Sequence, residues 1–197
     1  MKILLISANT LKAPYPVYPI GLDYVAGALN ERHAVEILDL NTVDQTDALP
    51  RALNRLKPDL IGISLRNIDN TDIVDIQSYL AGYRDLVNTI RSRSKALIVL
   101  GGSGFTIFPR RIIKAVGADY GIVGEGERLN LLIDALESAG NPSDIAGVIA
   151  QGSASYKPQP WRAPLNRDFQ PFRPHTAYYL KHGAMLNRQS KRGGPFR

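Results

Sequence analysis

Four short segments of this chain carry the glycines and polar side chains with which it could bind a ligand. They are residues 8–21, 64–72, 100–109 and 124–128. Glycines let a ligand approach the backbone closely, and several such segments together suit a wide, apolar ligand. The chain has no cysteine, and no two of its three histidines share a metal-site spacing. The sequence therefore excludes a thiolate metal site and a cysteine nucleophile.

Each segment also has a purely structural interpretation. Gly101, Gly102 and Gly104 suit a tight strand-to-helix turn. Glu125 and Glu127 suit the positive end of a helix dipole. The Asn and Asp residues of the second segment are common helix caps, and the tyrosines and prolines of the first could pack their own loop. It is the combination of four segments that favours a binding site.

The elements that must position these segments alternate regularly. Short apolar runs rich in β-branched residues predict strands, and the stretches between them predict helices. The strands are predicted at residues 2–7, 34–40, 59–64, 96–100, 120–124 and 145–151, and the helices at 21–30, 48–56, 71–93, 110–116 and 129–139. This alternation predicts a doubly wound α/β fold, Rossmann-like or flavodoxin-like, with a parallel sheet. In such a fold ligands bind beyond the carboxyl ends of the strands, where all four segments emerge.

Familiar ligands of this fold can be tested by their chemistry. Flavin mononucleotide needs a Ser/Thr-rich loop after the first strand, but residues 8–21 are rich in proline and tyrosine. The acidic residues of a phosphorelay receiver are missing, since the first strand ends in SAN and the third in GISL. No GxGxxG follows a strand and no GxxxxGK[ST] occurs, which argues against dinucleotide and P-loop sites. The familiar ligand that remains is cobalamin, which is large and planar and inserts a tail between sheet and helices.

Residues 152–197 differ from the rest of the chain. They hold nine basic residues against one acidic residue and six of the 13 prolines, whereas residues 1–151 hold 15 basic and 17 acidic residues. We therefore expect an α/β domain over 1–151 and a Pro-rich basic linker over 152–197. The aromatic residues expected to anchor this linker are Trp161, Phe169, Phe172 and Tyr178.

The distribution of charge and of apolar residues also limits the classes of partner that we expect. The positive charge lies on the extension and not on the fold, so we expect no nucleic-acid partner. The alternative, a single-strand-binding ribbon of aromatic and arginine residues, would lack a platform of strands. No run of 18 apolar residues occurs, so we expect no membrane partner and a cytoplasmic location.

Four stretches carry a resemblance to a known family. They are PIGLDYVAGALNERHAVEILDLN (19–41), PDLIGISLRN (58–67), VLGGSGFTIFP (99–109) and ADYGIVGEGE (118–127). Together they resemble the N-terminal cobalamin-binding domain of cobalamin-dependent radical S-adenosylmethionine enzymes. In that family a linker leads to an RGCPFxCxxC segment, whose cysteines hold a [4Fe-4S] cluster. The ending KRGGPFR is similar to the start of that segment, so we expect the chain to stop just before the cluster motif.

The resemblance implies cobalamin as the cofactor of this chain, with no catalytic residue and no metal ligand of its own. It implies a parent enzyme that also uses S-adenosylmethionine and a [4Fe-4S] cluster. That parent would be a methyltransferase acting on an unactivated carbon. Its radical SAM barrel domain, in cis, would hold a small-molecule or peptide substrate. The chain alone would bind cobalamin without turning over.

The resemblance also assigns roles to the four segments. The glycine segment (100–109) would line the groove for the nucleotide tail of cobalamin with residues 101–103. The Glu/Gly segment (124–128) would border this groove with residues 124–127. The Tyr/Pro loop (8–21) would cover the corrin with residues 14–19. Arg66 would lie near the lower face of the corrin and disfavour a lower ligand of cobalt, because a guanidinium stays protonated and offers no lone pair. The candidate residues are Tyr15, Pro16, Tyr18, Ser64, Leu65, Arg66, Asn67, Gly101, Gly102, Ser103, Gly104, Phe105, Gly124, Glu125, Gly126 and Glu127.

Two departures from the family pattern keep alternatives open. Gly194 stands where the first cluster cysteine is expected, which keeps open the alternative of a stand-alone cobalamin carrier or sensor domain. The DxHxxG motif of other cobalamin domains is absent, so no imidazole from the loop after the first strand would reach cobalt. A further alternative is the sugar-nucleotide-binding half of a glycosyltransferase, with the glycine segment and Glu125 binding diphosphate and ribose.

Overall fold

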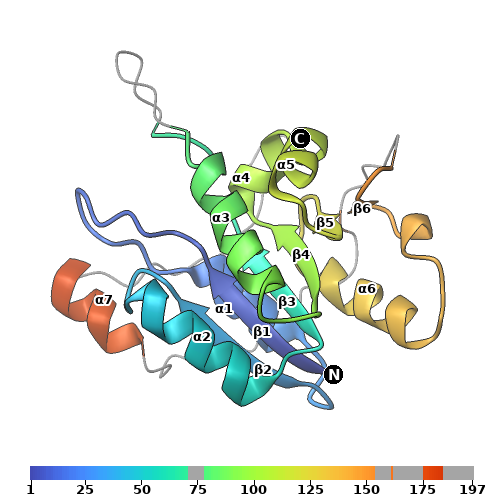
Figure 1. Ribbon diagram of the computed structural model, residues 1–197, viewed down its shortest axis with the longest axis horizontal. Coiled ribbons are helices and arrows are strands. Elements are labelled where there is room, and N and C mark those ends of the chain that lie inside the picture. The colour runs from blue at the N-terminus through green and yellow to red at the C-terminus, as the bar shows by residue number, and fades with distance from the viewer. Residues whose placement is uncertain (71–77, 154–160, 162–174, 184–197) are drawn as a thin grey trace.

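The computed structural model describes residues 1–70, 78–153, 161 and 175–183 (Figure 1). The described ranges contain one sheet, in the strand order β2-β1-β3-β4-β5-β6. Its strands are β1 (Lys2–Ser7), β2 (Ala34–Asp39), β3 (Leu60–Ser64), β4 (Leu97–Gly101), β5 (Tyr120–Ile122) and β6 (Val148–Ala150). Strands β1 to β5 pair in parallel, which confirms the predicted doubly wound α/β fold.

Helices cover both faces of this sheet, as Figure 1 shows. One face carries α1 (Ile20–Ala28) and α6 (Arg128–Glu137); the other carries α2 (Gln45–Leu56), α3 (Leu80–Arg91) and α5 (Pro109–Val116). The shorter elements are α4 (Ser103–Ile107), the 3-10 turn η1 (Pro142–Asp144) and α7 (Thr176–Gly183). Within the described ranges, no helix has the length and apolar character needed to cross a membrane.

The strand side chains alternate between two buried cores. Ile3 and Leu5 pack with residues of α1 and α6, whereas Leu4 and Ile6 pack with residues of α2, α3 and α5. Successive side chains of a strand point to opposite faces, so a strand buried on both faces is apolar at nearly every position. This is why the apolar runs predicted the strands to within a few residues of their observed ends.

Local capping sets the helix ends. The Asp44 side chain accepts a hydrogen bond from the Thr46 amide at 2.8 Å, so α2 begins three residues before its predicted start at Ala48. Helix α5 has Pro109 at its first position and ends at Val116, followed by the C-cap residue Gly117, whose φ is 82°. Both features agree with the predicted span 110–116.

β6 corrects the expectation of a wholly parallel sheet, because it runs antiparallel to β5. After α6 the chain returns to the carboxyl edge before β6 begins. There Arg128 Nη1 donates to the Ala146 carbonyl, and the Val123 amide donates to the Gly147 carbonyl at 2.8 Å. Because β6 starts at the edge where β5 ends, its direction is reversed.

Two predicted boundaries on the other elements were wrong. The helix predicted over 71–93 begins at Leu80, since Asp69 and Ser78 form an antiparallel bridge and the Tyr79 amide donates to the Ile68 carbonyl at 2.9 Å. Residues 71–77 lie outside the described ranges. The segment expected to be a loop at 100–109 contains α4, a short helix that begins directly after Gly102.

The C-terminal extension is not linker throughout. It contains α7, in which Tyr179 is fully buried. Trp161 lies against the body, with the Arg128 guanidinium 5.4 Å from its ring centroid, while Tyr178 stacks on His182 of its own helix. The expected anchors Phe169 and Phe172, and also Gly194, lie outside the described ranges. The division of the chain at residue 151 stays a prediction.

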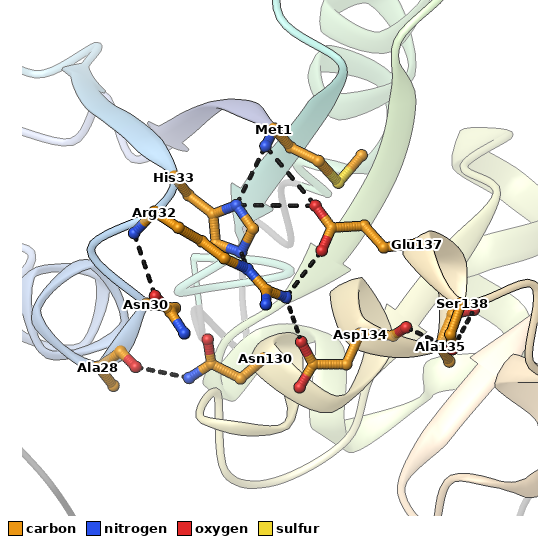
Figure 2. Close-up of polar contacts among 10 residues, drawn as sticks. All are labelled: Met1, Ala28, Asn30, Arg32, His33, Asn130, Asp134, Ala135, Glu137 and Ser138. Carbon is orange, nitrogen blue, oxygen red and sulfur yellow. Dashed lines mark hydrogen bonds and ion pairs between the residues drawn. The ribbon is translucent and has the colours of Figure 1, made fainter.

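A polar cluster fastens α6 at the amino edge of the sheet (Figure 2). Arg32 Nη2 is 2.7 Å from both Asp134 Oδ1 and Glu137 Oε2, and the Met1 amino group donates to His33 Nδ1 at 3.1 Å. Half-exposed ion pairs of this kind contribute about 1 kcal/mol or less each. The cluster joins α6 to the turn between α1 and β2, at the end of the sheet opposite the four candidate segments.

Candidate functional site

A cavity of about 660 Å³ lies at the carboxyl edge of the sheet, on the face covered by α1 and α6. Its floor is formed by Leu5, Gly62, Val99 and Ile122, one residue from each of four neighbouring strands. Its walls are α1, the loop before α1 and the start of α6. The wall residues are Val17, Tyr18, Pro19, Ile20, Gly21, Leu22, Val25 and Leu129.

The cavity exists because three strands end in small residues that lie in register. Ser7 of β1 pairs with Ser64 of β3, and Ser64 pairs with Gly101 of β4. Each lies two positions after a floor residue of its own strand, so all three point to the same face of the sheet as the floor. Large apolar side chains would normally fill these positions against α1 and α6. The small ones leave space beside the point where strand order reverses, between β1 and β3.

The rim of the cavity is held by main-chain hydrogen bonds between the segments after β3 and β4. The Leu65 amide donates to the Gly101 carbonyl at 2.8 Å, and the Gly104 amide donates to the Leu65 carbonyl at 2.9 Å. Gly102 has φ of 95°, and a Cβ there would lie 2.5 Å from the Leu65 carbonyl oxygen. Only glycine fits this position, so the two segments form one unit.

Thr106 ties the Glu/Gly segment after β5 to the same unit. Its hydroxyl donates to the Gly102 carbonyl at 3.1 Å and accepts from the Gly124 amide at 3.1 Å. Gly126 lies against the Val25 side chain of α1, where a Cβ would overlap it. Three of the four candidate segments thus meet around one cavity.

The fourth segment, the loop before α1, contributes Tyr18. This residue is 3% exposed, and its hydroxyl donates to Asp23 Oδ2 at 2.7 Å, in the first turn of α1. Its neighbours Val17 and Pro19 also line the cavity. The loop therefore forms a side wall.

Nine of the sixteen predicted site residues line the cavity. They are Tyr18, Ser64, Arg66, Gly101, Gly102, Ser103, Gly124, Glu125 and Gly126. The other seven do not line it, for reasons that differ. Tyr15 is 42% exposed, Pro16 is buried in the loop before α1, and Gly104 lies in α4 against the main chain of residues 65 and 66. Leu65 and Phe105 are fully buried on the opposite face, Asn67 accepts from the Tyr83 hydroxyl through its carbonyl, and Glu127 is the buried cap residue of α6.

The sequence interpretation missed the floor and the α1 wall. Gly62 of the floor was not singled out, and neither were Ser7 at the end of β1 and Thr106 of α4, which also line the cavity. The available signal was the alternation of small residues along the third strand, Gly62 and Ser64, next to a serine that ends the first strand. Glycine in a strand interior often marks a close approach of another group.

The cavity offers few polar groups, and those it has are hydroxyls, main-chain amides and two charges. Arg66 is exposed at the rim, and Glu125, in the segment after β5, also lines the cavity. None of the described histidines lines the cavity, and the described residues contain no group of three His, Cys, Asp or Glu side chains that could hold a metal. This chemistry suits a large ligand with an apolar part to bury and a polar part at the rim.

Comparison with known proteins decides between the ligands of this fold. Residues 6–134 match the sequence model of the B12 binding domain. The chain belongs to the B12-binding domain family. The matched span begins at the end of β1 and includes β2 to β5 and the four segments that surround the cavity. The expected recognition of a cobalamin-binding domain is confirmed.

Individual relatives are methyltransferases or radical SAM enzymes. The chain is 28% identical over 131 residues to a tryptophan 2-C-methyltransferase of Streptomyces laurentii, covering 64% of this chain and 21% of that protein. It is 26% identical over 170 residues to an uncharacterized methyltransferase of Pyrococcus horikoshii, covering 82% and 35%.

Solved structures agree with these relatives. The radical SAM methyltransferase TsrM of Kitasatospora setae, with cobalamin and a [4Fe-4S] cluster bound, has a TM-score of 0.67 and 29% identity, over 76% of this chain and 28% of that one. The radical enzyme OxsB, with aqua-cobalamin bound, shares the fold with a TM-score of 0.65 at 17% identity, over 82% and 22%. The chain spans only about a fifth to a third of the length of these relatives.

Proposed function

We propose that this B12-binding domain holds cobalamin in the cavity at the carboxyl edge, as part of a radical SAM methyltransferase acting on an unactivated carbon. The observation that carries the proposal is the in-register row of Ser7, Ser64 and Gly101, which makes room on the sheet surface inside the family's matched region. The methyltransferase relatives support the reaction class.

The cradle around the cavity suits the tail of cobalamin. Gly101 has only the Ile122 carbonyl oxygen near its missing Cβ, at 3.9 Å, so a ligand can lie directly on the backbone there. The apolar floor and the α1 wall would bury the tail from water, while Ser103 and Thr106 would orient its polar groups. Bound cobalamin would supply a cobalt centre able to carry a methyl group, and the protein would supply position and exclusion of water.

Arg66 is the residue that we propose to face the corrin. It is exposed at the cavity rim, and no ion pair of its guanidinium occurs within the described ranges. A guanidinium cannot ligate cobalt, because it stays protonated and has no free lone pair. Arg66 would therefore occupy space near the metal without binding it.

The remaining parts of the reaction would lie on sequence outside this chain. A radical SAM barrel in cis, with S-adenosylmethionine and a [4Fe-4S] cluster, would complete the active centre, as the contents of TsrM suggest. The substrate, a small molecule or a peptide, would bind to that part. We propose a cytoplasmic location for the assembled enzyme.

The direct test is retention of cobalamin. Purified protein is incubated with hydroxocobalamin, desalted and examined by visible absorbance, with an unrelated protein as control. We expect a corrin band that stays with the protein in about equimolar amount. A protein that loses the band but binds a nucleoside diphosphate sugar would overturn the proposal and favour the glycosyltransferase alternative.

A further inference from the structure

Helix α7 packs on the body of the domain beside the loop that follows β1, although it comes from the extension after β6 (Figure 1). Tyr179 is its anchor. The side chain is 0% exposed, and its hydroxyl donates to Asp39 Oδ2 at 2.6 Å, at the carboxyl end of β2. A charge-assisted hydrogen bond in a buried setting is among the stronger single polar contacts in a protein.

Asp39 also connects Tyr179 to the first half of the loop, through hydrogen bonds of Asn41. Its Oδ1 accepts a hydrogen bond from the Asn41 amide at 3.2 Å, and Asn41 Nδ2 donates to the Leu11 carbonyl at 3.2 Å. Asp39 and Asn41 are both almost completely buried. One buried carboxylate therefore connects α7 with the loop main chain at residue 11.

The second half of the loop touches α7 directly. The Tyr18 ring lies edge-on to the Tyr179 ring, with centroids 5.4 Å apart, and is stacked on His175 at 5.5 Å. At the other end of α7, a Cβ on Gly183 would lie 3.3 Å from the Pro16 carbonyl oxygen. Tyr18 and its neighbour Val17 line the cavity, so α7 supports a wall of the site from behind.

We propose that α7 is a positioning element of the binding site, in which Tyr179 fixes the loop of residues 9–18 as the side wall of the cavity. The extension would then be part of the binding unit and not only a connection to further sequence. The identification of cobalamin as the ligand that contacts this wall rests on the function proposed above. The positioning itself is a property of the chain and can be measured without any ligand.

Hydrogen–deuterium exchange of the full chain tests the positioning. Tyr179→Phe removes the hydroxyl but keeps the ring, so we expect the amides of residues 9–18 to exchange about tenfold faster or more. Tyr178→Phe is the matched control, because this hydroxyl is on the same helix and makes no hydrogen bond within the described ranges. The amides of β4 serve as an internal reference and should not change in either variant.

The outcomes separate positioning from general stability. Faster exchange confined to residues 9–18 supports the proposal; unchanged exchange, or equal acceleration in β4, overturns it. If Tyr179→Phe does not fold, Gly183→Val presses on Pro16 from the far end of α7, leaves Tyr179 in place, and should accelerate the same amides.

Cobalamin retention by the same variants then links the wall to the ligand. We expect Tyr179→Phe to release cobalamin about tenfold faster than wild type and Tyr178→Phe to behave as wild type. Equal release by all three proteins would overturn the role of α7 in the site. Failure of the wild type to retain cobalamin would instead contradict the function proposed above, while the exchange result would still decide whether α7 positions the loop.

Discussion

Replacement of Gly101 by leucine should close the site without unfolding the domain. Gly101 ends β4 in an extended conformation, and the nearest atom to its missing Cβ is the Ile122 carbonyl oxygen at 3.9 Å. A leucine side chain would therefore grow into the 660 Å³ cavity and not into packed atoms. Because glycine in a strand interior is unfavourable, the unfolding free energy should stay the same or rise by about 0.5–1 kcal/mol.

The effect on binding should have the opposite sign. A ligand that fits against the backbone at Gly101 must move or overlap the new side chain, and overpacking of this kind costs about 1–3 kcal/mol. That range corresponds to roughly 5- to 150-fold weaker cobalamin binding. The assay is an equilibrium titration with hydroxocobalamin, followed by absorbance after ultrafiltration, alongside urea unfolding of the same protein.

Gly82→Leu is the matched control, since Gly82 lies on α3 on the opposite face and also has open space around its missing Cβ. It should leave the cobalamin affinity unchanged. If Gly101→Leu bound cobalamin as tightly as wild type, the ligand could not lie on β4 at this point. If it lost binding only together with folding, the space beside Gly101 would not be free to accept a side chain. Either result would refute the assignment of the cavity.

Three further predictions test other parts of the structure. Gly102→Ala should lower the unfolding free energy by about 2–5 kcal/mol, measured by urea unfolding, because φ of 95° and the contact with the Leu65 carbonyl oxygen both oppose a Cβ; an unchanged midpoint would contradict the close approach. Arg66→Ala should change the visible spectrum of bound cobalamin by admitting a ligand to the metal, and an identical spectrum would discard the placement of Arg66. Burial and the neighbouring Met1 amino group lower the pKa of His33 below its ordinary 6.5, so the unfolded state binds the proton more tightly. The contribution of His33 to the unfolding free energy should therefore be complete above pH 6.5 and should fall as the pH drops below 6.5, by at most about 1.4 kcal/mol per pH unit. In unfolding experiments between about pH 5 and 8, His33→Gln should reduce this dependence of the unfolding free energy on pH.

Much of the fold could be predicted from the sequence because it depends on local pattern. β1 is apolar at every position from Ile3 to Ile6, as expected for a strand buried on both faces. Gly102 and Gly124 both adopt positive φ at the ends of parallel strands, and the sequence indicated the right segments there. Helix boundaries were less predictable. The start of α3 depends on the bridge between Asp69 and Ser78, a pairing that no local periodicity reveals.

The parts of the site that were missed depend on contacts between distant residues. Ser7, Ser64 and Gly101 make a cavity only because the strand register aligns them, and register is set by pairing across the sheet. Phe105 directly follows Gly104 in sequence but turns to the other face of the sheet, where it packs against Gly121. Helix α7 is short, and such a helix gains most of its stability from packing, here through Tyr179.

The rim of the cavity is built from main-chain groups, and this has a consequence for how the site can change. The bonds that join Leu65, Gly101 and Gly104 are made by main-chain groups, and the side-chain constraint on them is that Gly102 stays glycine. Substitution of the side chains of Arg66 and Glu125 would leave these main-chain bonds in place, whereas insertion of one residue into either segment would disrupt them. The outline of the cavity thus depends on main-chain bonds, and its chemical character depends on the side chains that line it. Substitutions of those side chains can therefore change which ligand binds while the outline stays the same.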